Sequence, residues 1–401
     1  MAERFSRFSF GTKVYAEWRI IVEKENIITI HALGDSLVTA YGDDESNFIG
    51  GWGDHLWSFF DPDYVHVNVY AQGGRSSRSF LNEGRFVDNG NFTESDFPYN
   101  TGPAYNRIKA GDYVLMQFGH NDDNTKEKFT YVDRMTPLGI PDENGIYPTV
   151  VPDDSMKVPA DDVPQEYAGL LRVEGHSEET IAEYVKKYEA VVASYGEKYW
   201  PYNCKATYKG YLKYYIDKVR ELGATPVIVT SAARQYFKEG RIIAVPGHHG
   251  GSDKFGDFPY VRAAKQIAEQ ENAPVLDLFE YSRSLFEMLG EEDSKSLQSI
   301  KDKNGVTIGE KRHQRPAKWV EGYDEYWNNP EYFVVDNTHQ NRFGSYIFAA
   351  VLAECIRVQI PELGKHVLAK SLKQVKCPAR IQNRIPDIER YMENVFIVSK
   401  R

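Results

Sequence analysis

The feature that most constrains the fold of this chain is a series of five short apolar runs, each of which ends in small or polar residues. Strands that are hydrophobic almost throughout are typical of a parallel sheet whose two faces are both covered. Segments with helical spacing of apolar residues lie between the runs, which indicates that strands and helices alternate along the chain. The strands predicted by this pattern are residues 27–33, 66–71, 113–119, 226–231 and 274–279.

Three of the intervening segments have the pattern of helices with a buried face. Residues 211–223 carry an apolar stripe on one face and end at Gly223, a residue that commonly terminates helices. Residues 258–273 repeat this pattern, and residues 344–360 are apolar enough for a final buried helix. The sequence therefore predicts an α/β protein with a three-layer, doubly wound, flavodoxin-like fold and a mainly parallel five-stranded sheet.

Two long insertions interrupt this plan. Residues 123–206 separate the third and fourth strands, and the prolines in their first half predict irregular structure. Residues 177–196 instead have the spacing of an amphipathic helix, with Ser177 as its N-cap. A second insertion, residues 287–330, is charged and then aromatic. The predicted organisation is an N-terminal extension (1–26), one domain that contains both insertions (27–360) and a C-terminal tail (361–401).

We expect the insertions to form a lid or a subunit contact. The tyrosine- and valine-faced helix at 181–195 and the tail have more apolar surface than a peripheral lobe needs. Soluble monomers rarely expose large contiguous apolar patches, so this surface predicts a homo-oligomer.

Composition and charge exclude several classes of function. The net charge of -10 leaves no basic footprint for nucleic acid or an anionic membrane surface. The three cysteines include no C-x-x-C pair, which argues against a disulfide framework and a thiolate zinc site. No apolar run reaches the length needed to span a membrane, and the first residues lack the apolar core of a signal peptide. We therefore expect a cytoplasmic protein, unless a signal segment precedes this sequence.

Polar residues follow the predicted strands at their carboxyl ends, where open α/β sheets bind ligands. Ser36 follows the first strand within the string GDSL, and Gly74 lies at a glycine turn after the second. Asn121 follows the third strand, and Asp336 and His339 precede the last helix. We expect these five residues to meet at one edge of the sheet.

These residue types complement one another chemically. A serine hydroxyl is a weak nucleophile until an imidazole accepts its proton, and a carboxylate fixes the tautomer of that imidazole. The tetrahedral intermediate needs hydrogen-bond donors at its oxyanion, each contributing on the order of 3 kcal/mol, and a glycine N–H or an asparagine amide can serve. Ser36, His339, Asp336, Gly74 and Asn121 thus complete a hydrolase site that requires no metal and no cofactor.

Other polar groups are weaker candidates. Asp63 and His66 have the same Asp-x-x-His spacing but precede the second strand, at the opposite edge, so we assign them to a turn. His120 is a rival base because it lies beside Asn121 in the sequence. Two adjacent histidines, His248 and His249, seldom bind one metal through both rings without a third ligand.

The chain resembles the SGNH (GDSL-like) hydrolases, whose four blocks supply serine, glycine, asparagine and histidine in that order. The matching blocks here are GDSL at 34–37, the glycines at 73–74, GHND at 119–122 and DNTH at 336–339. The stretches 73–86, 111–122 and 223–237 are similar to the rhamnogalacturonan-acetylesterase-like branch of that superfamily, and the overall resemblance covers about 27–122, 207–290 and 331–358.

The resemblance implies a role for each of these residues. Ser36 would be the nucleophile and His339 the base, with Asp336 orienting His339. The oxyanion hole would consist of the backbone N–H groups of Ser36 and Gly74 and the side chain of Asn121. Asp35, on the same resemblance, holds the turn rather than taking part in the chemistry.

The resulting prediction is a serine esterase that removes O-acetyl groups from plant cell-wall carbohydrate through an acetyl-enzyme. Acetylated rhamnogalacturonan and xylan oligosaccharides are both candidate substrates, and Tyr326 and Trp327 are candidates for an apolar wall beside a sugar ring. Two alternatives stay open: a GDSL-type lipid esterase or thioesterase with the same triad, and a non-catalytic carbohydrate-binding protein on a hydrolase scaffold.

Overall fold

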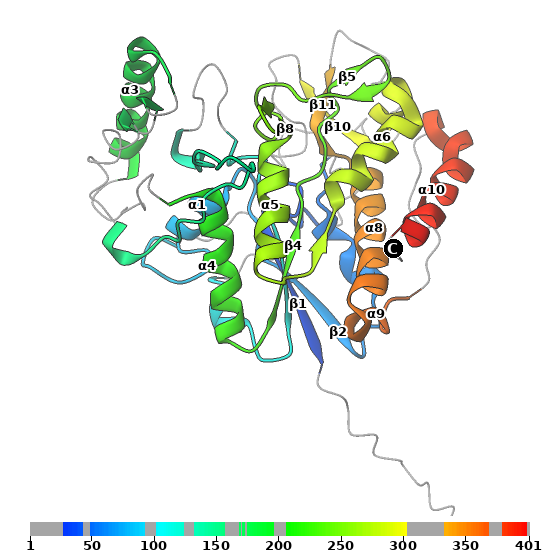
Figure 1. Cartoon of the computed structure of the whole chain (residues 1–401). Coiled ribbons are helices and arrows are strands. Elements are labelled where there is room, and N and C mark those ends of the chain that lie inside the picture. The colour runs from blue at the N-terminus through cyan, green and yellow to red at the C-terminus, as the bar shows by residue number, and fades with distance from the viewer. Residues whose placement is uncertain are drawn as a thin grey trace, which may run out of the picture.

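A parallel sheet of five strands forms the centre of the molecule (Figure 1), as the sequence predicts. Neighbouring strands are hydrogen-bonded in the order β2-β1-β3-β4-β9, and every pair is parallel. This is the strand order of flavodoxin-like doubly wound folds. The strands are β1 (Ile28–Gly34), β2 (Val65–Val69), β3 (Tyr113–Gln117), β4 (Thr225–Val229) and β9 (Val275–Leu276). This computed structural model describes residues 27–42, 49–92, 102–123, 132–156, 168–169, 171–172, 175–195, 206–302, 333–368 and 379–398.

The strands occupy the predicted runs, but β9 is shorter than its run. Its two residues are followed at once by Asp277, whose carboxylate accepts a hydrogen bond from the Glu280 N–H and so caps the next helix. The apolar residues after Asp277 therefore belong to a helix, because an N-cap fixes where the helix begins.

Helices cover both faces of the sheet and make it the middle of three layers (Figure 1). On one face, Val114 and Met116 pack with α1 (Ser77–Asn82), α4 (Tyr208–Glu221) and α5 (Pro259–Gln270). On the other face, Leu115 packs with α6 (Leu278–Ser294) and α8 (Arg342–Gln359). Adjacent residues of β3 thus pack into the cores on opposite faces of the sheet. Both faces are buried, which explains why the predicted strands are apolar without alternating polar residues.

An antiparallel ribbon of two strands, β10 (Gln298–Asp302) and β11 (Phe333–Gln340), lies outside the parallel sheet. Figure 1 shows it above the carboxyl ends of the sheet strands. The ribbon has no counterpart in the strands predicted from the sequence. The beginning of the predicted 287–330 insertion continues α6 and then forms β10, while residues 303–332 lie outside the described residues.

The first insertion contains the predicted helix, α3 (Glu178–Tyr195), and Ser177 Oγ accepts a hydrogen bond from the Thr180 N–H at 3.2 Å. Residues 135–153 contain no helix or strand, as the prolines predict. On the apolar face of α3, Ile181, Tyr184 and Tyr188 are buried within the same chain. The Tyr188 hydroxyl also accepts a hydrogen bond from the Arg78 guanidinium of α1, at 2.6 Å. These residues are therefore already covered without a second subunit.

The described part of the C-terminal tail packs on the domain as well. It comprises α9 (Pro361–Gly364), a 3₁₀ turn (Ala379–Arg384) and α10 (Ile385–Val398), which lies beside α6 and α8 (Figure 1). Ile388, Tyr391 and Met392 are buried in the core that α8 shares. The homo-oligomer stays a prediction, and at these residues the apolar surface that suggested it is internal.

Within the described residues, no helix is long and apolar enough to cross a membrane.

Candidate active site

The turn after β1 holds Ser36 at the carboxyl edge of the sheet. A Cβ atom on Gly34 would lie 2.5 Å from the Gln117 carbonyl oxygen and 2.6 Å from Val38, so only glycine allows the chain to leave β1 this closely packed. The Asp35 carboxylate accepts a hydrogen bond from the Leu37 N–H at 2.9 Å and closes the turn around the serine. The sequence interpretation of Asp35 as a turn residue agrees with this contact.

Ser36, His339 and Asp336 form one continuous hydrogen-bonded chain. The Ser36 Oγ lies 2.8 Å from His339 Nε2, and His339 Nδ1 lies 2.7 Å from Asp336 Oδ2. Asp336 is fully buried, whereas the His339 side chain is 23% exposed. The three side chains thus have the order of nucleophile, base and orienting acid that activates a serine.

Asp336 and His339 reach this position on β11. The second carboxylate oxygen of Asp336 accepts hydrogen bonds from the N–H groups of Thr338 (2.8 Å) and His339 (3.3 Å), which fixes the acid beside the imidazole. Asn341, the next residue after the strand, caps α8 and donates to the Ser296 carbonyl at 2.7 Å. Asn341 therefore anchors the ribbon directly after the acid–base pair.

The glycine turn after β2 lies next to the serine. A Cβ atom on Gly73 would be 3.8 Å from the Ser36 Cβ, and Gly74 has a φ of +79°, which favours glycine. Among the hydrogen bonds of the described chain, neither the Ser36 N–H nor the Gly74 N–H has an acceptor. Both N–H groups are therefore available to an oxygen of a substrate.

Asn121 lies on the third neighbouring loop. Its side-chain amide donates one N–H to the Arg75 carbonyl at 3.1 Å, a contact that ties it to the glycine turn. An asparagine amide carries two N–H donors, so a second remains for a substrate. The structure thus places Ser36, Gly74 and Asn121 on adjoining loops, with His339 of β11 hydrogen-bonded to Ser36.

A cation from the first insertion approaches the same turn. A Cβ atom on Gly74 would lie 2.7 to 2.9 Å from three atoms of the Arg134 guanidinium, so the guanidinium lies against the glycine. A side chain at position 74 would displace this guanidinium, which a flexible arginine allows, so the positive φ is the stronger reason for glycine there. The sequence contained no signal for the Arg134 contact, because the insertion has no regular pattern at Arg134.

A buried carboxylate behind the site connects two of the loops. Asp122 accepts hydrogen bonds from both the N–H (3.0 Å) and the hydroxyl (2.5 Å) of Ser77, the first residue of α1. Burial raises the pKa of Asp122 to about 7, against the hydrogen bonds that lower it. The Asp122–Ser77 pair fixes the glycine turn relative to Asn121. The sequence did not predict this contact, although Asp122 belongs to the GHND string.

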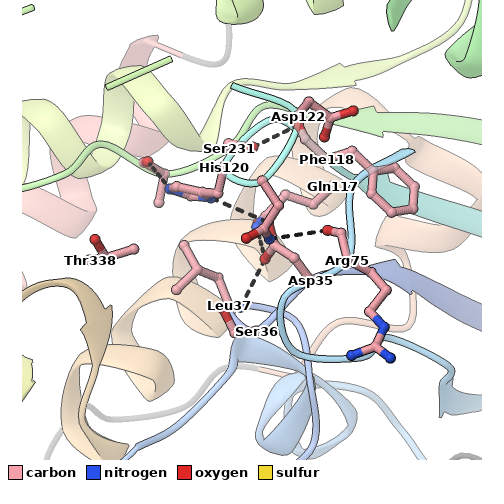
Figure 2. Close-up of polar contacts among 12 residues, drawn as sticks. Asp35, Ser36, Leu37, Arg75, Gln117, Phe118, His120, Asp122, Ser231 and Thr338 are labelled. Carbon is pink, nitrogen blue, oxygen red and sulfur yellow. Dashed lines mark hydrogen bonds and ion pairs between the residues drawn. The ribbon is translucent and has the colours of Figure 1, made fainter. Parts of the chain in front are cut away.

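His120 faces Asp35 rather than Ser36 (Figure 2). Its Nε2 lies 2.9 Å from the Ala232 carbonyl, and its Nδ1 lies 3.4 Å from the second carboxylate oxygen of Asp35. Burial lowers the pKa of His120, although Asp35 raises it. Because His339 holds the hydrogen bond to Ser36, the geometry gives His120 a supporting place behind the nucleophile turn.

The adjacent histidines are also supporting residues. His248 accepts a hydrogen bond from the Arg234 N–H and donates to the Ile243 carbonyl, while His249 binds the Ala232 carbonyl. Burial lowers the pKa of His248 to about 3. The described residues contain no group of acids, histidines and cysteines arranged to hold a metal ion.

Tyr326 and Trp327, the predicted sugar-facing residues, lie outside the described residues.

Comparison with known proteins supports the same interpretation. No protein-family profile matches the chain. The probable rhamnogalacturonan acetylesterase YesY of Bacillus subtilis (strain 168) is 27% identical over 264 residues, covering 66% of this chain and 76% of that protein. The rhamnogalacturonan acetylesterase RhgT of the same organism is 25% identical over 348 residues, covering 86% and 97%. These similarities and the parallel sheet support an SGNH hydrolase.

One solved structure that the comparison found is that of YxiM from Bacillus subtilis, which is 19% identical to this chain. Its TM-score is 0.41, and the match covers 84% of this chain and 56% of the other. Both Bacillus relatives carry the name rhamnogalacturonan acetylesterase, and the similarity to them supports a carboxylic ester hydrolase.

Proposed function

We propose that this chain is a serine esterase that removes O-acetyl groups from plant cell-wall carbohydrate. The observation that carries the proposal is the continuous Ser36–His339–Asp336 chain, with contacts of 2.8 and 2.7 Å, beside two backbone N–H groups without acceptors. The hydrogen-bonded chain of serine, histidine and aspartate is the arrangement that activates a serine. The two N–H groups are the kind of donors that stabilise an oxyanion.

The geometry assigns each group a step. His339 Nε2 takes the proton of the Ser36 hydroxyl as Oγ attacks the ester carbonyl, and the Asp336 carboxylate stabilises the resulting imidazolium. The N–H groups of Ser36 and Gly74 and the free N–H of Asn121 receive the oxyanion. The imidazolium then protonates the sugar oxygen as its C–O bond to the acetyl carbon breaks, which releases the sugar hydroxyl and leaves an acetyl group on Ser36.

Deacylation uses the same groups. Neutral His339 removes a proton from a water molecule, which attacks the acetyl-enzyme and releases acetate. The His339 imidazole is therefore the base in both steps.

Rhamnogalacturonan is the substrate we favour, and acetylated xylan is the second candidate. The names of the two relatives support rhamnogalacturonan. The net charge of -10 supports the neutral xylan instead, because it disfavours an acidic chain by electrostatic steering.

The experiment measures acetate release from acetylated rhamnogalacturonan and xylan oligosaccharides by the wild type and by Ser36→Ala. We expect release from at least one of them by the wild type and a loss of at least about a thousandfold in the variant, since the nucleophile is removed. An octanoyl ester is the comparison substrate. Hydrolysis of the octanoyl ester without acetate release from either carbohydrate would contradict the proposal and favour a lipid esterase.

A further inference from the structure

A pocket of about 300 Å³ lies beside the edge strand β2, and its lining contains none of the catalytic residues. The residues that line it include Asp54, Trp57, Asn68, Tyr70 and Arg107. Its volume is at the lower end of the range for ligand pockets, which suits one ring rather than a large molecule. Its lining combines an aromatic side chain with carboxylate, amide, hydroxyl and guanidinium groups.

Trp57 is the exposed large apolar side chain of this pocket. Its indole is 56% exposed, although burying an aromatic side chain of this size is normally favourable. The indole N–H donates to the Asp54 carbonyl at 2.9 Å, so the polar edge of the ring is satisfied and its orientation is fixed. An isolated exposed tryptophan needs no explanation, but one that is held in place on the wall of a pocket offers a rigid, apolar face to a ligand.

The pocket is also close to the nucleophile. Ala40 and Gly42 form part of its wall, and Tyr41 between them donates a hydrogen bond from its hydroxyl to the Ser36 carbonyl at 3.0 Å. The wall and the serine are therefore separated by about the length of one tyrosine side chain. A short oligosaccharide with its ester at Ser36 can reach the pocket with a sugar further along its chain.

We infer that this pocket is a carbohydrate subsite, in which one pyranose ring stacks on Trp57 and binds the Asn68 amide through its hydroxyl groups. The inference rests on the proposed function for the class of substrate. It adds the place on the protein where a further sugar of the substrate binds. Asn68 is exposed on β2 and its side chain hydrogen-bonds to Tyr70. An asparagine amide has two N–H donors and a carbonyl acceptor, so further groups remain for a sugar. Asp54 is a fixed part of the wall, because its carboxylate accepts hydrogen bonds from the N–H groups of Gly42 (2.7 Å) and Gly51 (3.2 Å).

The test compares KM for acetate release across acetylated oligosaccharides of increasing length, with 4-nitrophenyl acetate as the substrate without a sugar. In Trp57→Ala, we expect the ratio of variant to wild-type KM to grow with chain length and to reach about fivefold to tenfold, the effect of one lost aromatic contact. Asn68→Ala should act in the same direction. Tyr64→Ala is the matched control, since Tyr64 is 38% exposed, stacks on His366 and does not line the pocket.

A KM ratio for Trp57→Ala that does not change with chain length would overturn the inference and leave the proposed function intact. A second measurement is calorimetric binding of deacetylated oligosaccharides to Ser36→Ala, with and without Trp57→Ala. If the wild type releases no acetate from carbohydrate, the proposed function fails, and this binding measurement decides the subsite alone. Weaker binding in the double variant would support it, and equal binding or none would overturn it.

Discussion

At the scale of single residues, the site depends on positions where only one side chain satisfies the local geometry. Gly74 combines a φ of +79° with the contact to the Arg134 guanidinium, whereas a Cβ on Gly73 would make only ordinary contacts at 3.8 Å. Two adjacent glycines of one turn therefore differ in what they tolerate. We expect the Gly74 N–H to donate a hydrogen bond to the oxyanion, and the backbone conformation at Gly74 determines where that N–H lies.

Gly74→Ala should therefore lower kcat by about a hundredfold to a thousandfold, the effect of losing one oxyanion donor, with a smaller change in KM. An alanine at this φ is strained, so the N–H moves. Steady-state kinetics with 4-nitrophenyl acetate measure the change, and Gly73→Ala is the control that should stay near the wild type. Equal kcat values for Gly74→Ala and the wild type would show that the Gly74 N–H does not contact the oxyanion.

At the scale of elements, the site is held by contacts between segments far apart in the sequence. Asp122, on the loop after β3, binds the first residue of α1, Ser77, which follows the glycine turn. The ribbon β10–β11 places His339 over the carboxyl edge, and Asn341 anchors the ribbon to Ser296. The first contact ties the loop of Asn121 to the helix that follows the glycine turn, and the second fixes the strand that carries His339.

The buried Asp122 should also make stability depend on pH. Its pKa is raised from 3.8 to about 7, so the native state retains a proton that the unfolded chain releases between about pH 4 and pH 7. Its contribution to the free energy of unfolding therefore falls as the pH rises through this window. Asp122→Asn keeps an acceptor for Ser77 and does not titrate. Its stability relative to the wild type should rise by on the order of 2 kcal/mol between pH 5 and pH 8.

Urea unfolding of the wild type and Asp122→Asn at several pH values measures this difference. Asp63→Asn, which removes an exposed carboxylate from the turn before β2, controls for the loss of one negative charge. A constant difference between Asp122→Asn and the wild type from pH 5 to pH 8 would show that Asp122 ionises in the native state as it does in the unfolded chain.

At the scale of the whole molecule, local patterns predicted the architecture and the five residues of the sheet edge. Strands that are apolar throughout and polar residues at their ends are local signals, and the topology of a doubly wound sheet brings those ends together. The ribbon could not be predicted in the same way, because β11 pairs with a segment far from it in the sequence. The Arg134 contact at Gly74 and the Asp122–Ser77 pair likewise join distant residues without any repeat or period.

The central claim is that Ser36 carries the acetyl group during turnover. The most direct test is to mix the enzyme with 4-nitrophenyl acetate, quench the reaction in acid during the initial burst, and locate the acetyl group by peptide mass spectrometry. If Ser36 is the nucleophile, we expect one acetyl group on the peptide that contains Ser36 and none in Ser36→Ala. Unimpaired turnover by Ser36→Ala, or a transient acetyl group on another residue with Ser36 unmodified, would contradict it.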